Sequence, residues 1–163
     1  MLLAIVSDTH MPKGGRALPD ACVERLRAAD LILHAGDFVE LPVLREIESY
    51  GAVSAVHGNV DTSQVRELLP EVRVVEAAGA RIAIVHDGGR ADGRLTHLQR
   101  RFPRADAVVF GHSHLPLHER ADDGFQIFNP GSPTERRRAP AHTMGIARVD
   151  AEGVVEFELI ELS

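Results

Sequence analysis

Cysteine, large aromatic residues and long apolar runs are all scarce in this 163-residue chain. Cys22 is the only cysteine, which excludes an internal disulfide and fits a reducing compartment. No apolar run approaches the roughly 20 residues that a transmembrane helix requires. The apolar start at residues 2–6 is too short for a signal peptide and lacks a basic flank. We therefore expect a cytoplasmic protein that does not enter a membrane.

Basic residues are in the minority, with 18 lysines and arginines against 24 acidic residues and a net charge of −6. This balance argues against general affinity for nucleic acid or for anionic membranes. A compact anionic substrate would need local positive charge, such as bound metal. The length predicts a single domain over residues 1–163, and hydrophobic residues, at 44%, are numerous enough for a sizeable core.

Apolar runs bounded by turn residues predict an α/β protein, with strands and helices alternating at first and strands dominating later. We expect strands at residues 1–7, 31–35, 53–57, 71–77, 81–86, 107–110, 117–120, 126–128, 143–149 and 154–162. We expect helices at residues 19–28, 42–50 and 93–102, and a short helix or a loop at 63–70. This order of elements predicts a mixed sheet packed on a second sheet, with helices outside.

What the chain does have is histidine, nine residues of it, and several of these follow the expected strands. Five strands end in acidic, amide or imidazole side chains: Asp8-x-His10, Gly36-Asp37, Gly58-Asn59, His86 and Gly111-His112-x-His114. Taken singly, most of these motifs are more typical of a turn or of a hydrogen-bonded structural histidine than of a metal site. Ligand sites in open α/β sheets lie beyond the carboxyl ends of the strands, so the joint pattern predicts one shared site.

Two aspartates, one asparagine and four histidines exceed what one small divalent ion needs. The set suits two ions that share a bridging carboxylate. Mixed oxygen and imidazole ligands favour Mn, Fe, Zn, Co or Ni over Ca. The sequence therefore predicts a site for two divalent metal ions.

In order, the motifs SDTH, GD, GN, H and GHSH resemble those of the calcineurin-like metallophosphoesterase superfamily. The resemblance runs from Asp8 to the NPGS segment at residues 129–132 and is strongest to its compact single-domain branch in bacteria and archaea. That branch is also similar to the retromer scaffold subunit of eukaryotes. The resemblance implies a four-layer αββα sandwich, in which two facing mixed β-sheets are flanked by helices and the metals lie at one edge.

The resemblance also implies roles for the seven residues. One ion would be held by Asp8, His10, Asp37 and His114. The other would be held by Asp37, Asn59, His86 and His112, with Asp37 bridging. Catalytic roles would fall to Asp37, Asn59 and His112, and Asn59 would also bind substrate.

Two such ions can generate a bridging hydroxide at neutral pH and neutralise charge on phosphoryl oxygens. We therefore expect a hydrolase that acts on a small phosphoester by in-line attack, with phosphodiesters favoured over phosphomonoesters. Manganese is the expected metal, and Ni, Fe, Zn, Co and Mg are the alternatives. An oligomer is compatible with the sequence.

The chain departs from the family pattern at Val60, directly after Asn59, where many members carry a histidine that assists the leaving group. General acid–base help is typically worth about 10²–10⁴-fold, so we expect a slow enzyme or one that favours good leaving groups. Without a histidine partner, Asp61 is expected to cap the following turn. Asp87 either orients His86 or starts the glycine turn that follows, and we favour the turn.

A run of three arginines follows the NPGS segment. A solvated loop is the usual structure for such a run. The functional alternative is an arginine that reaches the substrate, because guanidinium groups match phosphate oxygens. Arg136, Arg137 and Arg138 are the candidates for this role.

Two alternatives to a phosphodiesterase remain open on the sequence. One is a phosphomonoesterase or nucleotide phosphatase that uses the same residues. The other is a catalytically weak scaffold that binds partner proteins, for which Val60 and the similarity to the retromer subunit are the arguments. The complete ligand set favours the enzyme, whereas an exposed apolar surface away from the metal edge would favour the scaffold.

Overall fold

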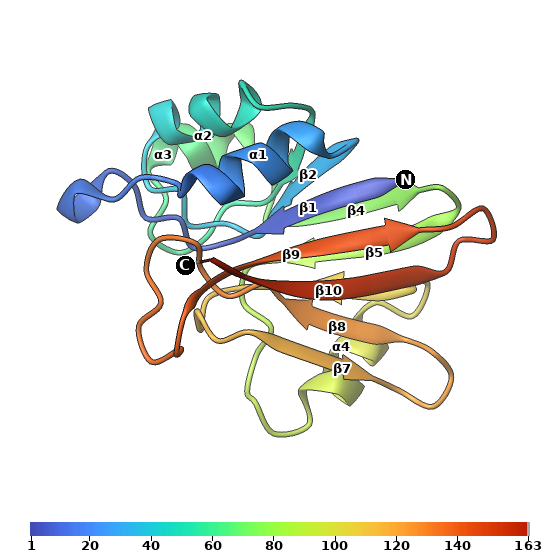
Figure 1. The fold of residues 1–163 in the computed structure, drawn as a ribbon. Coiled ribbons are helices and arrows are strands. Elements are labelled where there is room, and N and C mark those ends of the chain that lie inside the picture. The colour runs from blue at the N-terminus through green and yellow to red at the C-terminus, as the bar shows by residue number, and fades with distance from the viewer. Residues whose placement is uncertain (163) are drawn as a thin grey trace.

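The predicted apolar runs form two five-stranded β-sheets in the computed structural model, which describes residues 1–162 (Figure 1). The strands are β1 (Leu2–Val6), β2 (Leu31–His34), β3 (Val53–Ala55), β4 (Val72–Ala77), β5 (Ala80–Val85), β6 (Ala107–Val109), β7 (Leu117–Arg120), β8 (Gln126–Asn129), β9 (His142–Val149) and β10 (Val155–Leu162). The helices are α1 (Asp20–Ala28), α2 (Leu41–Glu48), α3 (Ser63–Leu68) and α4 (Arg94–Arg101), with a 3-10 turn at Lys13–Gly15.

Both sheets combine parallel and antiparallel pairs. The first has the order β10-β9-β1-β2-β3. Its strands β1, β2 and β3 are parallel, and β9 pairs antiparallel with both β1 and β10. The second has the order β4-β5-β6-β8-β7, in which β5, β6 and β8 are parallel and the two edge strands are antiparallel. The expectation of two facing mixed sheets is confirmed.

Apolar side chains of β1 face two different layers, which explains why this strand is an unbroken apolar run. Leu3 and Ile5 pack against the second sheet, whereas Ala4 and Val6 pack against helices. Successive side chains of a strand point to opposite faces, so a strand covered on both sides needs apolar residues at every position. The buried side chains of residues 1–162 form clusters between sheet and sheet, and between each sheet and its helices.

Helices complete the sandwich on both sides. In Figure 1, α1, α2 and α3 lie over the sheet that contains β1 and β2, and α4 lies beyond the other sheet. Helix α1 buries Cys22 and Leu26 against the first sheet, and α4 buries Leu98 against the second. The four-layer αββα architecture predicted from the motifs is therefore confirmed.

The segment at 63–70, left open as helix or loop, begins with helix α3. Several expected strands are shorter than predicted, among them β3, which ends at Ala55, and β6, which ends at Val109. In both cases the chain leaves the sheet early and starts the loop that carries the predicted ligands. No helix among residues 1–162 has the length and apolar character to cross a bilayer.

Candidate metal centre

Five of the seven predicted ligands have a left-handed backbone, which non-glycine residues rarely adopt. They are Asp8 (φ 57°), His10 (φ 40°), Asp37 (φ 64°), His112 (φ 71°) and His114 (φ 61°). All five lie in loops that leave β1, β2 and β6 at one edge of the sandwich. Strained conformations of this kind concentrate at functional sites, where the surrounding structure holds them in place.

Two glycines let these loops approach closely. A Cβ atom on Gly58 would lie 2.0 Å from Asp37 Oδ1, and one on Gly111 would lie 2.0 Å from Ser7 Oγ and 2.7 Å from Asp8 Oδ2. All three distances are shorter than real contacts allow. The glycines of the GN and GH motifs therefore bring the loops together rather than only turning the chain.

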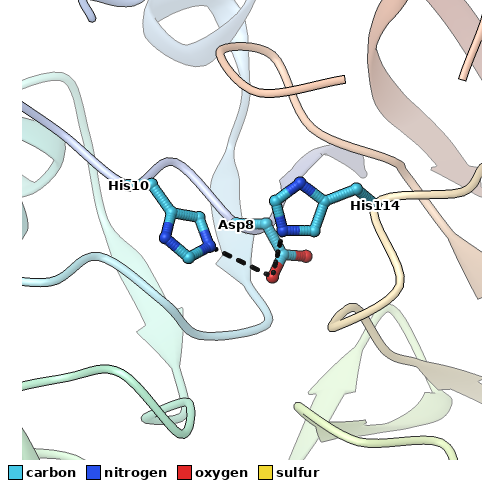
Figure 2. Close-up of side chains that lie close together, drawn as sticks. All are labelled: Asp8, His10 and His114. Atoms are coloured by element: carbon cyan, nitrogen blue, oxygen red, sulfur yellow. Dashed lines mark ion pairs between the residues drawn. The ribbon is translucent and has the colours of Figure 1, made fainter. Parts of the chain in front are cut away.

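Asp8, His10 and His114 form one compact group of buried side chains. Both imidazoles in Figure 2 turn a nitrogen toward the Asp8 carboxylate, although His114 comes from a distant part of the chain. The distance from Asp8 Oδ1 to Nε2 is 3.8 Å for His10 and 3.5 Å for His114. The other carboxylate oxygen, Oδ2, accepts hydrogen bonds from Ser7 Oγ at 2.8 Å and from the His112 amide at 3.0 Å. Asp8 is thus fixed through one oxygen while the other faces two imidazoles.

Asp37 and His86, together with Asp8, form a second buried group beside the first. His86 Nε2 lies 3.2 Å from Asp37 Oδ2 and 3.9 Å from Asp8 Oδ1. The same Asp37 oxygen lies 3.4 Å from His10 Nε2, so this carboxylate faces a histidine of each group. Asp8 therefore belongs to both groups, and Asp37 faces a histidine of each.

Asn59 and His112 lie at the exposed end of this arrangement. Asn59 Oδ1 is 2.9 Å from His86 Nε2 and 3.1 Å from His112 Nδ1. All seven predicted residues consequently converge at one place, although they come from segments up to 106 positions apart (114 − 8).

Main-chain carbonyls orient two of the histidines. His86 Nδ1 lies 2.7 Å from Ala35 O, and His114 Nδ1 lies 2.5 Å from Glu135 O. A carbonyl can only accept, so Nδ1 carries the hydrogen in both rings. Each ring therefore presents Nε2 to the carboxylates, which is the arrangement of a histidine that ligates metal through Nε2.

The charges of this cluster perturb its ionisable groups. Burial lowers the pKa of His10, but the nearby carboxylates of Asp37 and Asp8 outweigh it and raise the pKa to about 9. For His86 as well, burial lowers the pKa and Asp37 leads the groups that raise it above its usual value. Burial opposes ionisation of Asp37, yet the nearby imidazoles of His10 and His86 hold the pKa of that carboxyl well below its usual range. Protons on the imidazoles thus offset the buried negative charge.

A divalent cation fits this donor set better than protons do. Within the described part of the chain, Asp8 Oδ1, His10 Nε2 and His114 Nε2 are buried atoms without a hydrogen-bond partner. Unpaired buried polar atoms are rare and costly, and these three face one another. Carboxylate oxygen and imidazole nitrogen are ligands for Mn, Fe, Zn, Co and Ni. The geometry therefore supports a metal centre built from these groups.

The sequence missed the role of Asp61. It was expected to cap the following turn, but its buried carboxylate accepts hydrogen bonds from the amides of Asp37 (3.1 Å), Val39 (2.8 Å) and Gly58 (2.7 Å). Asp61 therefore ties the loops after β2 and β3 together behind the centre. Long-range amide contacts of this kind leave no signature in local spacing.

Asp87 behaves as the favoured prediction said, because its Oδ1 accepts the amide hydrogen of Gly89 at 2.8 Å and starts a turn. The three arginines are exposed. Arg136 donates to the carbonyl of Ala139 at 3.0 Å, which engages its guanidinium locally. A role for these arginines in substrate binding stays a prediction.

A cavity of about 530 Å³ opens directly beside Asn59 and His86. Its other walls include His57 after β3, Arg66 of α3, and Arg101 of α4. The lining has no aromatic ring apart from imidazoles, and it combines basic and acidic side chains. A polar organic group would find donors and acceptors here, within reach of the centre.

A four-layer sandwich with buried acidic and imidazole groups at one edge is typical of a class of metal-binding phosphoesterases. Comparisons with known proteins indicate the same class. Residues 1–152 match the model of the calcineurin-like phosphoesterase superfamily domain. A probable metallophosphoesterase of Methanothermobacter thermautotrophicus is 34% identical over 156 residues, covering 93% of this chain and 88% of the relative. The chain therefore belongs to the calcineurin-like phosphoesterase superfamily, as the motifs predicted.

Two solved structures share the fold. A structure described as a novel archaeal phosphodiesterase has a TM-score of 0.75 and 25% identity, covering 99% of this chain and 100% of that one. Vps29 of Entamoeba histolytica, solved in complex with Zn, has a TM-score of 0.77 and 22% identity, with 99% of each chain covered. The Vps29 likeness is evidence for the fold alone.

Proposed function

We propose that this protein is a phosphodiesterase that uses two divalent metal ions. The observation that carries this proposal is the convergence of three buried atoms without partners, Asp8 Oδ1, His10 Nε2 and His114 Nε2. Membership of the superfamily supports phosphoester hydrolysis in general. The resemblance to an archaeal phosphodiesterase supports diesters in particular.

The seven residues divide between two ions as the family pattern implies. One ion would be held by Asp8, His10, Asp37 and His114, and the other by Asp37, Asn59, His86 and His112. Bound ions of this kind supply a hydroxide nucleophile at neutral pH and positive charge for the phosphoryl oxygens. Manganese is the proposed metal, although Zn, Ni, Fe, Co and Mg suit the same donors.

The side chains of this chain supply positioning rather than acid–base catalysis. Asp37 faces both histidine groups through Oδ2 while its Oδ1 is fixed by the Val60 amide at 3.0 Å. Asn59 and His112 are exposed at the mouth of the centre, where they can contact the substrate. Val60 offers no proton to the leaving group, so good leaving groups are favoured.

The cavity beside Asn59 and His86 favours a substrate with an organic group next to its phosphate. Its volume of about 530 Å³ lies within the range of small-molecule sites, whereas a phosphate group alone would fill little of it. We propose that the second organic group of a diester lies between Arg66 and Arg101. A nucleotide phosphatase would use the same cavity for its single organic group, and therefore remains the competing enzyme.

A scaffold function would require a broad apolar surface, and the exposed large apolar side chains of residues 1–162 lie on several separate elements. They include Leu68 on α3, Val74 on β4 and Leu159 on β10. A scaffold would also have no use for a cluster of seven metal-type ligands, five of them buried. We therefore favour the enzyme.

A hydrolysis screen tests the proposal. Metal-free protein would be supplied with Mn, Ni, Fe, Co, Zn or Mg and assayed on matched aryl diesters and monoesters. We expect metal-dependent turnover, with kcat/KM higher for diesters, and Arg101→Ala should raise KM for diesters with a bulky second group only. Faster monoester turnover would favour the phosphatase. The absence of turnover with every metal, despite two bound ions, would favour the scaffold.

A further inference from the structure

The two groups of candidate ligands differ in what lies behind their histidines. His86 Nδ1 faces a main-chain carbonyl, that of Ala35. His114 Nδ1 also faces a main-chain carbonyl, that of Glu135, but in addition the Glu135 carboxylate lies near Nδ1 of both His10 and His114. In the sequence, Glu135 shows no sign of a role, because it stands before three arginines in what was expected to be a solvated loop.

The carboxylate of Glu135 is placed between these two rings. Its Oε2 lies 3.9 Å from His10 Nδ1 and 3.9 Å from His114 Nδ1, which are ion-pair rather than hydrogen-bond distances. Its Oε1 pairs with Arg16 Nη2 at 2.9 Å. Both side chains of this pair are 25% exposed, so the pair is partly shielded from water.

The backbone of Glu135 is anchored to the strand end that carries Asp8. Ser132 Oγ accepts the Glu135 amide hydrogen at 2.8 Å and itself donates to the carbonyl of Asp8 at 2.7 Å. Thr134 Oγ1 donates to the carbonyl of Thr9 at 2.5 Å. The segment from Ser132 to Glu135 is therefore built onto the Asp8 loop instead of hanging free in solvent.

We propose that Glu135, held by Arg16, is a positioning residue for the ion site formed by Asp8, His10 and His114. The proposal rests on the metal centre proposed above. A carboxylate behind a ligating imidazole orients the ring and raises its basicity, and removing such a partner typically weakens metal binding about 10–100-fold. Among residues 1–162, no carboxylate pairs with Nδ1 of His86, so the effect is confined to one ion.

Glu135→Gln is the informative variant, because it removes the charge and keeps the size and the main-chain carbonyl that orients His114. The matched control is Glu158→Gln, which neutralises a glutamate that pairs with Arg148 at 2.8 Å on the exposed β9–β10 ladder. Manganese titration by calorimetry gives the stoichiometry and both dissociation constants. Electron paramagnetic resonance distinguishes a coupled pair of Mn ions from single ions.

We expect the wild type and Glu158→Gln to bind two ions and to show a coupled spectrum. In Glu135→Gln, one dissociation constant should rise about 10–100-fold. The other should stay within twofold, and single-ion signals should appear at intermediate Mn concentration. Glu135→Asp should recover part of the loss. Arg16→Met should weaken the same site by less, because it frees the carboxylate without removing it.

Equal weakening of both sites, or unchanged constants in Glu135→Gln, would overturn the positioning role while leaving the metal centre intact. Failure of the wild type to bind two ions would overturn the metal centre and this inference together. If Glu135→Gln lowers the melting temperature of the metal-free protein more than the Glu158→Gln control does and both ions are lost, Glu135 has a structural role instead. Partial rescue by aspartate with selective loss of one ion has no such structural explanation.

Discussion

His114 donates its Nδ1 hydrogen to the main-chain carbonyl of Glu135, and this turns its Nε2 toward Asp8 Oδ1, 3.5 Å away. Burial lowers the pKa of His114, which favours the neutral ring. A neutral ring with its hydrogen on Nδ1 presents a lone pair at Nε2 to a carboxylate oxygen that also has only lone pairs. Two hydrogen-bond acceptors therefore face each other, which is unfavourable, and a cation bound between them would make the interaction favourable.

Metal binding should therefore stabilise the folded protein. A ligand that binds only the native state at 100 times its dissociation constant adds about 2.7 kcal/mol to the free energy of unfolding for each site. We expect Mn to raise the melting temperature and a chelator to reverse the rise. Thermal unfolding with and without Mn measures the effect. An unchanged melting temperature at saturating Mn would contradict the fit of the site to a cation.

Asp37→Ala should abolish both metal pairing and turnover, because the Asp37 carboxylate faces histidines of both groups. The measurements are metal content by elemental analysis and diester hydrolysis. Asp20→Ala, at an exposed position in α1, is the matched control and should retain both properties. Full activity in Asp37→Ala would end the two-ion mechanism.

Val60→His should change the rate or the leaving-group preference and leave metal content alone. Val60 is 42% exposed, so a larger side chain fits without disturbing the core, and its amide still reaches Asp37 Oδ1. A positioned acid contributes about 10²–10⁴-fold, mostly for poor leaving groups. Rates for a series of aryl diesters with different leaving-group pKa values test this. An identical dependence on leaving group in both proteins would count against a catalytic role for this position.

Asp61→Ala should destabilise the protein by about 3 kcal/mol, since three main-chain amides lose a buried charged acceptor. The amide of Asp37 is one of the three, so metal affinity should fall as well. Denaturant unfolding of the metal-free variant gives the first quantity and metal titration the second. Asp61→Asn keeps one acceptor oxygen and should lie between wild type and alanine. A loss below about 0.5 kcal/mol would mean that water replaces the carboxylate.

The metal-free protein should lose stability as the pH rises from about 6.5 to 9. The pKa of His10 is raised from 6.5 to about 9, so its contribution is complete below pH 6.5 and lost as the pH passes 9. The size of this contribution is at most about 3 kcal/mol. His34 stays uncharged throughout this window, because burial lowers its pKa to about 3.

Denaturant unfolding in the presence of a chelator at several pH values measures this slope. Metal competes with the same proton, so metal affinity should rise over the same window. The replacement His10→Gln should flatten the stability profile. A wild-type profile that rises between pH 6.5 and 9 would contradict the charge arrangement around Asp37 and Asp8.

The sequence by itself determined the identity and the order of the predicted ligands. Each of them follows an apolar run, and a short loop after a strand can only place its side chains near the end of that strand. The run of β1 also revealed burial on both faces, because Leu3, Ala4, Ile5 and Val6 leave no polar side. The two-sheet architecture followed from strands that alternate with helices and then outnumber them.

Only the tertiary structure decided what holds those ligands in place. Asp61 was expected to act locally and instead joins two loops, and Glu135 reaches Arg16 across 119 positions of sequence. The cavity beside His86 likewise combines α3 and α4, which pack on different sheets. The spacing of residues along the chain predicts secondary structure and the places where loops begin. Contacts between distant loops depend instead on how the two sheets face each other, and the periodicity of the sequence does not predict that arrangement.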